Sequence, residues 1–432
     1  MSDLKEILPT KSATVEAIEA WWKQRGDSEP GRKYLGGSEI GKECPRALWY
    51  SFRKCVKPDF SGQLYRLFYR GHNEEHTFVK ELRGIGCEVH EVGEDGKQFE
   101  VVACDGHFKG HADGVALGIP EAPKTWHLLE MKTASAKSFK GTKEKGVEID
   151  KPQHFAQMQV YMHLMGLTRA LYIVVNKDND ELYSERIRYD KTKAQALIDK
   201  ARRIISATTP PERISEPQEE PKFPFSPCNF CDARALCHGE SDVAVDVPKL
   251  DCRQCVHATP IENGEWACTL KDCDATEVCE HHLFLPGLIN FAEPTDKLEN
   301  KDGSDVIEFT SSDGTVWQHG PDETAGQYSS AILLSTPRDL ILPSVQKPKT
   351  EAKEAGPNLE ARYSTENDGV KVAWKGKVDD LYHNFGQLFE CPMTNPNAEQ
   401  SGNGWEAAEF YPHGCVIVYG NTAEIRTIEQ EY

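Results

Sequence analysis

The chain has 432 residues, a hydrophobic content of 38%, and 50 Lys and Arg against 69 Asp and Glu, for a formal net charge of −19. This length predicts two or three domains, and the hydrophobic content is sufficient for folded cores, which excludes wholesale disorder. The sequence has no run of about 18 apolar residues and no apolar signal region in MSDLKEILPTKS, so we expect a cytoplasmic protein without a membrane span.

The acidic excess is confined to the second half of the chain. Residues 1–240 contain 36 basic and 36 acidic side chains, which leaves 50 − 36 = 14 basic and 69 − 36 = 33 acidic ones in residues 241–432. The second half would repel phosphate at long range, whereas the neutral first half can still gather Lys and Arg on one face. The overall acidity therefore does not argue against DNA binding.

The order of the expected elements predicts the fold of the first half. Helices are expected at 14–25, 37–53, 63–82, 154–166 and 191–204, and strands at 87–92, 98–104, 107–117, 126–133, 170–176 and 182–189. This order predicts an α/β fold, in which an α+β mixed sheet is flanked by helices.

Beyond residue 205 the composition changes repeatedly. A proline-rich stretch leads to cysteines at 228–237, a second cysteine-rich segment covers 252–282, and a hairpin is expected at 303–320. We expect a first domain at 1–240, a small cysteine-rich metal module with the hairpin at 250–325, a linker at 326–367 and an acidic C-terminal α+β unit at 368–432.

The helix at 63–82 contains a carboxylate on its predicted buried face. Its apolar residues fall on one stripe at helical spacing: Leu64, Phe68, Phe78 and Leu82. Gly71 and Glu75 fall on the same stripe. Since a buried carboxylate is unfavourable without a partner, Glu75 is expected to meet a cation.

Two strands contribute the other charged residues of a candidate site. Asp113 lies in GHADGV, and Glu130 and Lys132 lie in LLEMKT, two residues apart and hence on the same face of a strand. Acidic oxygens on neighbouring strands can bind Mg²⁺ or Mn²⁺. A lysine beside them can orient an attacking water and neutralise a phosphate.

These residues resemble the PD-(D/E)XK nuclease superfamily, in particular its RecB-like branch, over residues 34–240. That branch includes the AddB nuclease subunit, CRISPR-adaptation exonucleases and many bacteriophage exonucleases. The resemblance implies a restriction-endonuclease-like core and a metal-dependent exonuclease that acts on DNA. Because the chain has no helicase motif, the phage type used in DNA recombination or processing is the best match, which would place the protein in the host cytoplasm.

The resemblance also assigns roles to individual residues. A glycine followed four positions later by a metal ligand corresponds to Gly71 and Glu75, and the acidic second motif corresponds to Asp113. Glu130 and Lys132 match the E-x-K motif, with the Met131 carbonyl as a further metal ligand. A Q-x-x-x-Y motif, which would contact DNA near the scissile phosphate, is formed by Gln157 and Tyr161.

The first motif leaves an alternative open. Many relatives have histidine four positions after the glycine, and here His72 and His76 flank Glu75. The spacing favours Glu75, with His76 as the alternative.

Fourteen cysteines in a cytoplasmic protein favour metal ligands over disulfides. RecB-like nucleases with an iron–sulfur cluster have one cysteine before the nuclease core and three after it, which corresponds to Cys44, Cys228, Cys231 and Cys237. Four thiolates suit a [4Fe–4S] cluster, and Zn²⁺ is the alternative. The remaining cysteines of the first half are expected to be small buried residues: Cys55, Cys87 and Cys104.

The second cysteine-rich segment has the spacing of a zinc knuckle. The expected ligands are Cys252, Cys255, Cys268 and Cys279, and the possible substitutes are Cys273, His257, His281 and His282. Because so short a segment cannot build an adequate core, Zn²⁺ is a reasonable folding device. Its acidic surroundings favour a structural or protein-contacting role over nucleic-acid binding.

Two classes of function follow from these residues. The leading hypothesis is a DNA exonuclease in which Glu75, Asp113 and Glu130 hold Mg²⁺ or Mn²⁺ and Lys132 positions the attacking water. The alternative is a regulated or inactive iron–sulfur DNA-binding scaffold whose acidic C-terminal half docks a protein partner. Since every motif position is filled, the enzyme is favoured.

Overall fold

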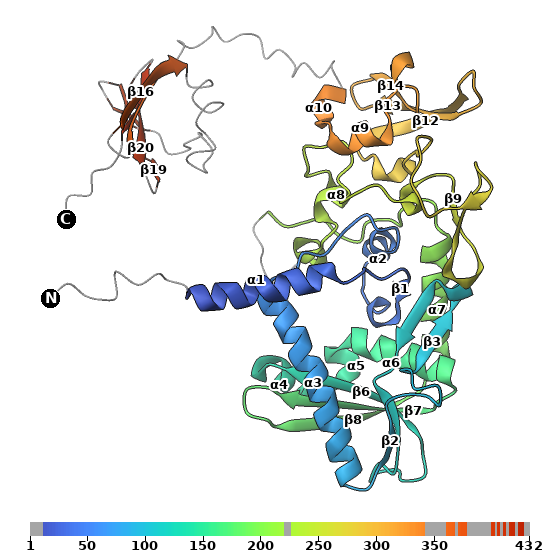
Figure 1. Ribbon diagram of the computed structural model, residues 1–432. Helices are drawn as coiled ribbons and strands as arrows, with labels where there is room; N and C mark the ends of the chain where they lie inside the picture. Colours follow the sequence, from blue (N-terminus) through green and yellow to red (C-terminus); the bar gives the residue numbers. More distant parts are fainter. Residues whose placement is uncertain are drawn as a thin grey trace, which may run out of the picture. The chain divides into compact units, whose positions relative to one another are not determined.

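The computed structural model describes residues 12–219, residues 226–341 and a set of strands between residues 360 and 426. Contacts divide the chain into two compact units, residues 1–344 and residues 345–432 (Figure 1). The predicted boundary near residue 240 lies inside the first unit, and the domain boundaries remain predictions. None of the described helices is long and apolar enough to cross a membrane.

The helices of the first unit agree largely with the expected positions. The α-helices are α1 (Ala13–Ser28), α2 (Pro45–Phe52), α3 (Gly62–Gly84), α4 (Ala136–Lys145), α5 (Val147–Asp150), α6 (Pro152–Met165), α7 (Lys191–Ser206), α8 (Arg234–His238), α9 (Ser330–Ser335) and α10 (Arg338–Ile341). The helix expected at 37–53 is instead a 3₁₀ turn, Gly37–Glu39, followed by α2, because the segment breaks before Pro45 at the first helical position.

The main sheet has five strands in the order β2-β5-β6-β7-β8. Their bounds are β2 (Glu88–His90), β5 (Gly114–Leu117), β6 (His127–Ala134), β7 (Arg169–Asn176) and β8 (Leu182–Arg188). Only β6 and β7 run parallel, and α4, α5 and α6 form the connection between them. The predicted mixed α/β architecture with helices against the sheet is confirmed.

Helices cover both faces of this sheet. Phe78, Val79 and Leu82 of α3 pack with Leu129 and Met131 of β6 on one face. On the other face, α6 packs against β6 and β7 through residues that include Met158, Val160, Leu128 and Val174. Alternate residues of β6 therefore enter different cores, as the two-residue period of a strand requires.

The N-terminal half of α3 corrects one expectation. Phe68, predicted to lie on the buried stripe, is 43% exposed, whereas Phe78 and Leu82 are buried. The helix extends beyond the sheet at its N-terminal end (Figure 1), so only its C-terminal half has a core to pack against.

Smaller sheets complete the chain. In the first unit they are β1 (Leu35–Gly36) with β4 (Phe108–His111) and β3 (Glu100–Ala103), β9 (Ala258–Pro260) with β10 (Trp266–Cys268) and β11 (Cys273–Asp274), and β12 (Ala292–Glu299) with β13 (Asp305–Ser311) and β14 (Val316–His319). The hairpin expected at 303–320 is β13–β14, with β12 as a third strand.

The range predicted to be a linker, residues 326–367, contains described elements. It includes α9 and α10, and Leu333 of α9 is fully buried in the main core. Residues 342–359 lie outside the described residues. The described elements of the second unit are β15 (Glu360–Asn367), β16 (Val370–Lys377), β17 (Glu399–Ser401), β18 (Gly404–Glu406), β19 (Glu409–Tyr411), β20 (Gly414–Tyr419) and β21 (Thr422–Arg426).

The cysteine-rich segment packs against α2 through buried arginines and aromatic rings. Arg53 donates to the backbone carbonyls of Arg253, at 2.9 Å, and Ala207, at 2.8 Å. The guanidinium carbons of Arg53 and Arg253 lie 4.9 and 5.2 Å from the ring centroid of Trp266. Cation–π contacts thus join residues 252–268 to the first helices.

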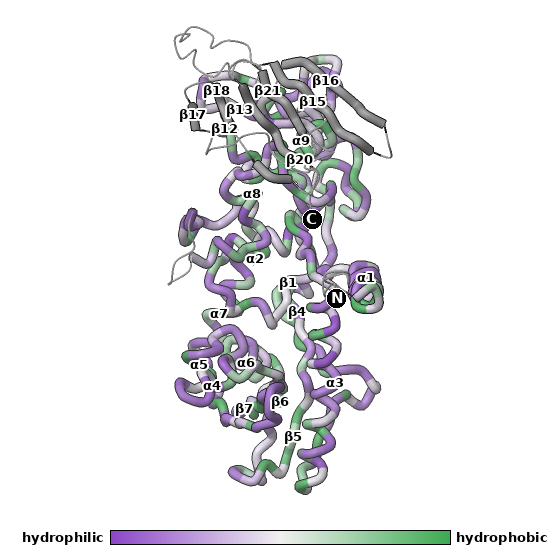
Figure 2. Tube along the Cα trace, turned by 90° about the vertical axis from the view of Figure 1, so that its left-hand side faces the viewer, coloured by the Kyte–Doolittle hydropathy of each residue, from purple (hydrophilic) through white to green (hydrophobic). Residues whose placement is uncertain are grey.

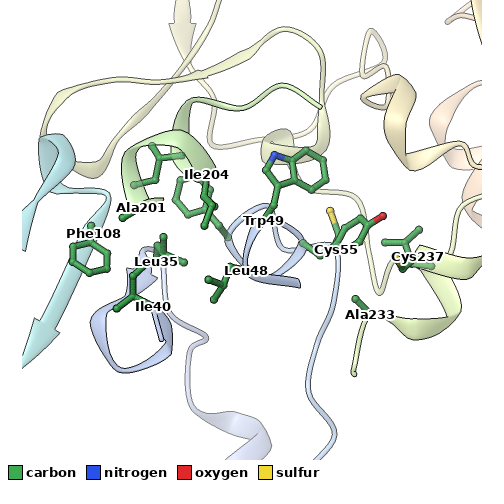
Figure 3. Packing of buried hydrophobic residues seen from close by; sticks show 14 of the residues in the cluster. Leu35, Ile40, Leu48, Trp49, Cys55, Phe108, Ala201, Ile204, Ala233 and Cys237 are labelled. Atoms are coloured by element: carbon green, nitrogen blue, oxygen red, sulfur yellow. The ribbon is translucent and has the colours of Figure 1, made fainter. Parts of the chain in front are cut away.

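The centre of the largest core lies around α2. Figure 3 shows Leu48 and Trp49 between Ile204 of α7 and the pair Ala233 and Cys237 near α8. This core therefore packs α2, near the N-terminus, against α7 and α8, which lie before residue 240.

We expect Leu48→Ala to lower the free energy of unfolding by about 2–5 kcal/mol, because it leaves a cavity at a fully buried position. Leu182→Ala makes the same chemical change at a half-exposed position on β8 and is expected to cost less than about 0.5 kcal/mol. Chemical denaturation of both variants tests this difference, and equal losses would contradict the packing around α2.

Candidate active site

The candidate site lies where strand β5 stops pairing with β6. The pairing of these strands ends at Gly114 opposite Leu129. The next residue of β6 along the chain is Glu130, and the residue before Gly114 is Asp113. The end of the ladder therefore brings the two predicted acidic residues together and leaves space beside β6 for side chains.

Asp113 closes this end of the ladder with its side chain. Its Oδ2 atom accepts a hydrogen bond from the backbone N–H of Met131 at 2.9 Å. The Nζ atom of Lys132 lies 3.4 Å from the same oxygen. Asp113 is thereby fixed between the backbone and the ammonium group of β6.

Glu130 is the most deeply buried of these groups, with 1% of its side chain exposed. Its Oε2 atom accepts a hydrogen bond from Gln157 Nε2 at 2.9 Å. Its Oε1 atom forms an ion pair with Lys132 Nζ at 2.7 Å and accepts no further hydrogen bond from a described residue. A buried carboxylate oxygen is thus left with capacity for another ligand.

The charges of the site shift one another's pKa values. Burial raises the pKa of Glu130 to about 7. The positive charge of Lys132 lowers this pKa, and the negative charges of Asp113 and Glu75 raise it further. Burial by itself would lower the pKa of Lys132, but Glu130, Asp113 and Glu75 more than offset burial, and its pKa is raised. Lys132 is therefore a protonated ammonium at neutral pH.

Glu75 approaches this cluster from α3. Its pKa is raised by burial and then by the negative charge of Asp113. Its Oε1 atom lies 3.4 Å from Nδ1 of His72. His76, the alternative ligand, is 77% exposed and lies 3.5 Å from Glu91, so it is paired away from Asp113.

Helix α6 provides the two remaining predicted residues. Gln157 holds Glu130, as described above, and Tyr161 is buried. The Tyr161 ring packs against Gly37 and Gly110, where a side chain would collide with it. Burial, followed by the charges of Glu130 and Asp113, raises the pKa of Tyr161, which keeps its hydroxyl protonated.

Two further residues of the site were not expected from the sequence. His154 Nδ1 lies 3.2 Å from the hydroxyl of Tyr172, and Tyr172 is the register partner of Glu130 on β7. Burial, reinforced by Lys132 and Lys151, lowers the pKa of His154 to about 4, so its ring is neutral. The spacing of His154 in the sequence could have indicated its place in the site, because position 154 lies on the same helical face as positions 157 and 161.

The structure thus brings Asp113, Glu130, Lys132 and Gln157 into direct contact, and Glu75 interacts with them electrostatically. Among the described residues, no group of three or more His, Cys, Asp or Glu side chains forms a set that could hold a metal ion. The donors are nevertheless of the type that Mg²⁺ and Mn²⁺ prefer, and one of them, Glu130 Oε1, has no hydrogen-bond partner among the described residues. Their chemistry therefore fits a hard divalent cation.

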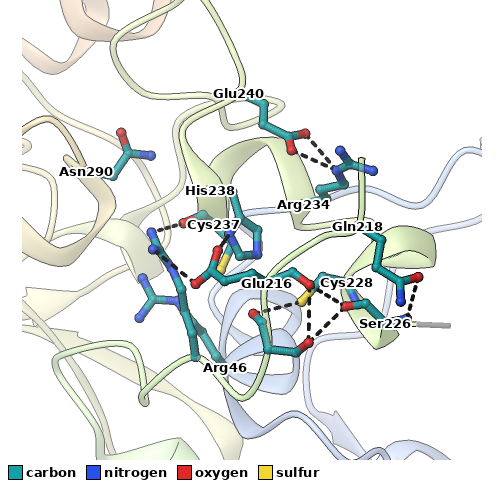
Figure 4. Close-up of polar contacts among 12 residues, drawn as sticks. Arg46, Glu216, Gln218, Ser226, Cys228, Arg234, Cys237, His238, Glu240 and Asn290 are labelled. Atoms are coloured by element: carbon teal, nitrogen blue, oxygen red, sulfur yellow. Dashed lines mark hydrogen bonds and ion pairs between the residues drawn. The ribbon is translucent and has the colours of Figure 1, made fainter. Parts of the chain in front are cut away.

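The four cysteines proposed for iron–sulfur binding interact electrostatically, although among the described residues they are not grouped so as to hold a metal ion. The pKa of Cys231 is raised by burial and then by the charges of Cys44, Cys228 and Cys237. Figure 4 shows Cys228 and Cys237 among the polar side chains around Glu216, with Cys228 Sγ 3.3 Å from the Ser215 carbonyl oxygen. The fold thus joins the N-terminus of α2 to residues 228–237.

The cysteines proposed for zinc binding also interact electrostatically, and among the described residues they too are not grouped so as to hold a metal ion. Burial raises the pKa of Cys252 to about 11, with contributions from Cys255, Cys279 and Cys268. Of the substitutes, His282 lies 2.8 Å from the Ser330 hydroxyl and 3.1 Å from the Asp251 carbonyl oxygen. Both of its ring nitrogens are engaged, which disfavours His282 as a ligand.

Comparison with known protein families gives one match. The family described as the PD-(D/E)XK nuclease superfamily matches residues 12–238, more than half of the chain. The chain belongs to the PD-(D/E)XK nuclease superfamily. This membership supports a nuclease function with nucleic acid as substrate.

Solved structures with similarity to this nuclease chain include SSO0001, with 16% identity over 52% of this chain and 96% of that one, at a TM-score of 0.31. They also include the alkaline exonuclease LHK-Exo from Laribacter hongkongensis, with 16% identity over 43% of this chain and 90% of that one, at a TM-score of 0.30. LHK-Exo in complex with dAMP gives 17% identity and a TM-score of 0.31. These scores are too low to support an argument. No curated protein sequence matches the chain.

We expect Glu130→Gln to change how stability depends on pH. Because the pKa of Glu130 is raised from 4.5 to about 7 in the folded state, ionising Glu130 destabilises the wild-type fold progressively as pH rises through this window. The glutamine variant has no carboxyl group to ionise at this position, so its fold is not destabilised in this way. Its free energy of unfolding relative to wild type should therefore rise between pH 5 and pH 8, by on the order of 2–3 kcal/mol.

The measurement is chemical denaturation with chelator at pH 5 and pH 8. Glu144→Gln, an exposed glutamate on α4, is the matched control and should follow the wild type. A difference between Glu130→Gln and wild type that stays constant or falls with pH would show that Glu130 is ionised in the folded protein throughout this range.

Proposed function

We propose that the protein is a metal-dependent DNA exonuclease whose catalytic residues are Glu75, Asp113, Glu130 and Lys132. The single observation that supports this most strongly is the cluster of the buried Glu130 with the partly buried Lys132 and Asp113 in a chain of the nuclease superfamily. A buried glutamate paired with a lysine is costly to stability, and it is the arrangement that a cation and a phosphate would compensate.

Each residue has a separate role in this proposal. Glu130 and Asp113, with Glu75 and the Met131 carbonyl, would hold Mg²⁺ or Mn²⁺. When bound, such a cation lowers the pKa of a water and neutralises charge on the phosphate. Lys132, held protonated between two carboxylates, would orient that water and donate a hydrogen bond to a phosphate oxygen. Gln157 fixes the Glu130 carboxylate, and the buried Tyr161 ring would support α6 behind the site through its packing on Gly37 and Gly110.

The alternative of an inactive DNA-binding scaffold is less well supported. Such a scaffold has no use for an ionisable residue buried to the extent of Glu130, and selection for stability would favour its loss. We also propose a role in phage DNA recombination or processing, which rests on the resemblance to stand-alone phage exonucleases. Docking of a protein partner by the acidic C-terminal half remains compatible with either function.

We expect Glu130→Ala to reduce Mg²⁺- or Mn²⁺-dependent DNA cleavage by at least about a thousandfold, since it removes a ligand of the essential cation. Glu144→Ala should cleave like wild type, because Glu144 is exposed on the neighbouring helix. The assay is digestion of end-labelled linear DNA, with circular DNA of the same sequence alongside. Cleavage of circular DNA would exclude an exonuclease, and full activity of Glu130→Ala would falsify the assignment of the site.

We further propose that Cys44, Cys228, Cys231 and Cys237 hold a [4Fe–4S] cluster, and that Cys252, Cys255, Cys268 and Cys279 hold Zn²⁺. The spacing of Cys228, Cys231 and Cys237 and the resemblance to iron–sulfur nucleases support the first site, and the knuckle-like spacing of residues 252–279 supports the second. A cluster at the first set would bind the N-terminus of α2 to residues 228–237 and so close the nuclease domain.

Anaerobically purified protein should therefore contain about four irons per chain and show the broad visible absorption of a cluster. Cys231→Ser should lose both the iron and thermal stability, whereas Cys104→Ser, a half-buried cysteine outside the set, should keep them. Iron-free protein with zinc at both cysteine sets would support the zinc alternative instead.

A further inference from the structure

An aromatic and basic groove lies beside the candidate active site. It has a volume of about 650 Å³, within the range of about 300–1,000 Å³ that is usual for ligand sites. Its walls are formed by α1, α3 and the residue that follows β7. The lining residues used below are Trp22, Arg66, Tyr69, Arg70, Asn73 and Lys177.

The helices that form the groove expose an unusual amount of aromatic surface. Helix α1 has no buried residue, although it contains adjacent tryptophans, and Trp21 is 52% exposed. Tyr69 of α3 is also exposed, and its ring centroid lies 5.1 Å from that of Trp22. Figure 2 shows hydrophobic and hydrophilic residues alternating along α3. Exposed apolar surface of this kind marks an interaction site.

The charges of the groove indicate what binds there. Its lining includes Arg66, Arg70 and Lys177 and contains no acidic residue. None of the three cations forms an ion pair with a described residue, and Arg70 donates only to the Lys177 carbonyl, at 3.4 Å. Unpaired cations beside exposed aromatic rings are the combination that binds single-stranded nucleic acid, through phosphates and stacked bases.

The groove lies near the cluster of Asp113, Glu130 and Lys132 on the side of β6. Lys177 donates its backbone N–H to the Ala134 carbonyl at 2.9 Å, and Ala134 is two residues beyond Lys132 on β6, or about 7 Å. On α3, Arg70 and Glu75 are five residues apart, so their side chains point about 140° away from each other around the helix. The groove and Glu75 therefore occupy different sides of α3.

We propose that this groove binds a single-stranded DNA segment, with bases stacked on Trp22 and Tyr69 and phosphates held by Arg66, Arg70 and Lys177. The inference rests on the proposed nuclease function, to which it adds a binding groove for an unpaired DNA strand on α1 and α3. The groove is lined by three cations and no acidic side chain, which favours a chain of phosphates over a protein partner.

The test measures binding of a fluorescein-labelled 20-nucleotide oligo(dT) to the full-length protein by anisotropy, in EDTA so that no cleavage occurs. Trp22→Ala should weaken binding about tenfold or more, since a stacked base is lost, whereas Trp21→Ala, the adjacent and more exposed tryptophan, should change it less than twofold. Neither variant should alter binding to a blunt 20-base-pair duplex, because paired bases cannot stack on the rings.

The phosphate contacts are tested by salt dependence. The double variant Arg66→Ala/Arg70→Ala should reduce the slope of log affinity against log salt by about 1.4 for the oligo(dT), because two phosphate contacts are lost. Arg202→Ala/Arg203→Ala makes the same change in charge on the exposed face of α7 and should leave the slope unchanged.

Equal effects of groove and control variants, or no effect of either, would overturn the proposal. A dimer that is detected by sedimentation and that dissociates in the Trp22→Ala variant would also overturn the proposal, because the groove would then be a dimer interface. Digestion of linear DNA with Mn²⁺ separates the two hypotheses. Groove-dependent binding without any cleavage would contradict the nuclease function alone, and cleavage without groove-dependent binding would contradict the groove alone.

Discussion

The ion cluster of the buried Glu130 with Lys132 and Asp113 is the interaction on which the rest of the site depends. It forms because the ladder between β5 and β6 ends at Gly114 and Leu129, so that the Asp113 side chain accepts the Met131 N–H at the end of the ladder. A shift of one residue in this register would turn Glu130 and Lys132 to the opposite face of the sheet. The chemistry of the site is therefore set by strand pairing.

The helices around the cluster fix the positions of individual side chains of the site. Helix α6 holds Glu130 through Gln157, and the glycines at positions 37 and 110 leave room for the Tyr161 ring. Helix α3 contributes Glu75 from its central turn and packs only its C-terminal half on the sheet. Its N-terminal half is consequently free to form, with α1, the groove that we assign to single-stranded DNA.

The sequence was informative where spacing fixes geometry. Glu130 and Lys132 alternate with Leu129 and Met131 on a strand, and Gln157 precedes Tyr161 by one helical turn, so their faces followed from the period of each element. Phe68 was predicted to be buried and is exposed, because helical periodicity does not reveal how far a helix extends beyond its sheet. The contact of His154 with Tyr172 joins two elements and could not be read from either one.

The contact between the cysteine-rich segment and α2 was also beyond the reach of sequence patterns. Arg53 and Arg253 appear to be ordinary surface cations in the sequence, yet both are buried around Trp266. Residues 252–268 thereby share the main core with the nuclease domain, and the first compact unit extends to residue 344. Burial of both arginines depends on partners about 200 residues away in the chain.

We propose that Glu75, Asp113 and Glu130 bind a divalent cation beside Lys132. The most direct measurement is anomalous diffraction from a crystal soaked in Mn²⁺. The expected result is a single strong peak between Asp113 and Glu130, in contact with Glu130 Oε1, that is absent from crystals of Glu130→Gln. No peak at this position in the wild type, or an equal peak in the variant, would contradict the claim.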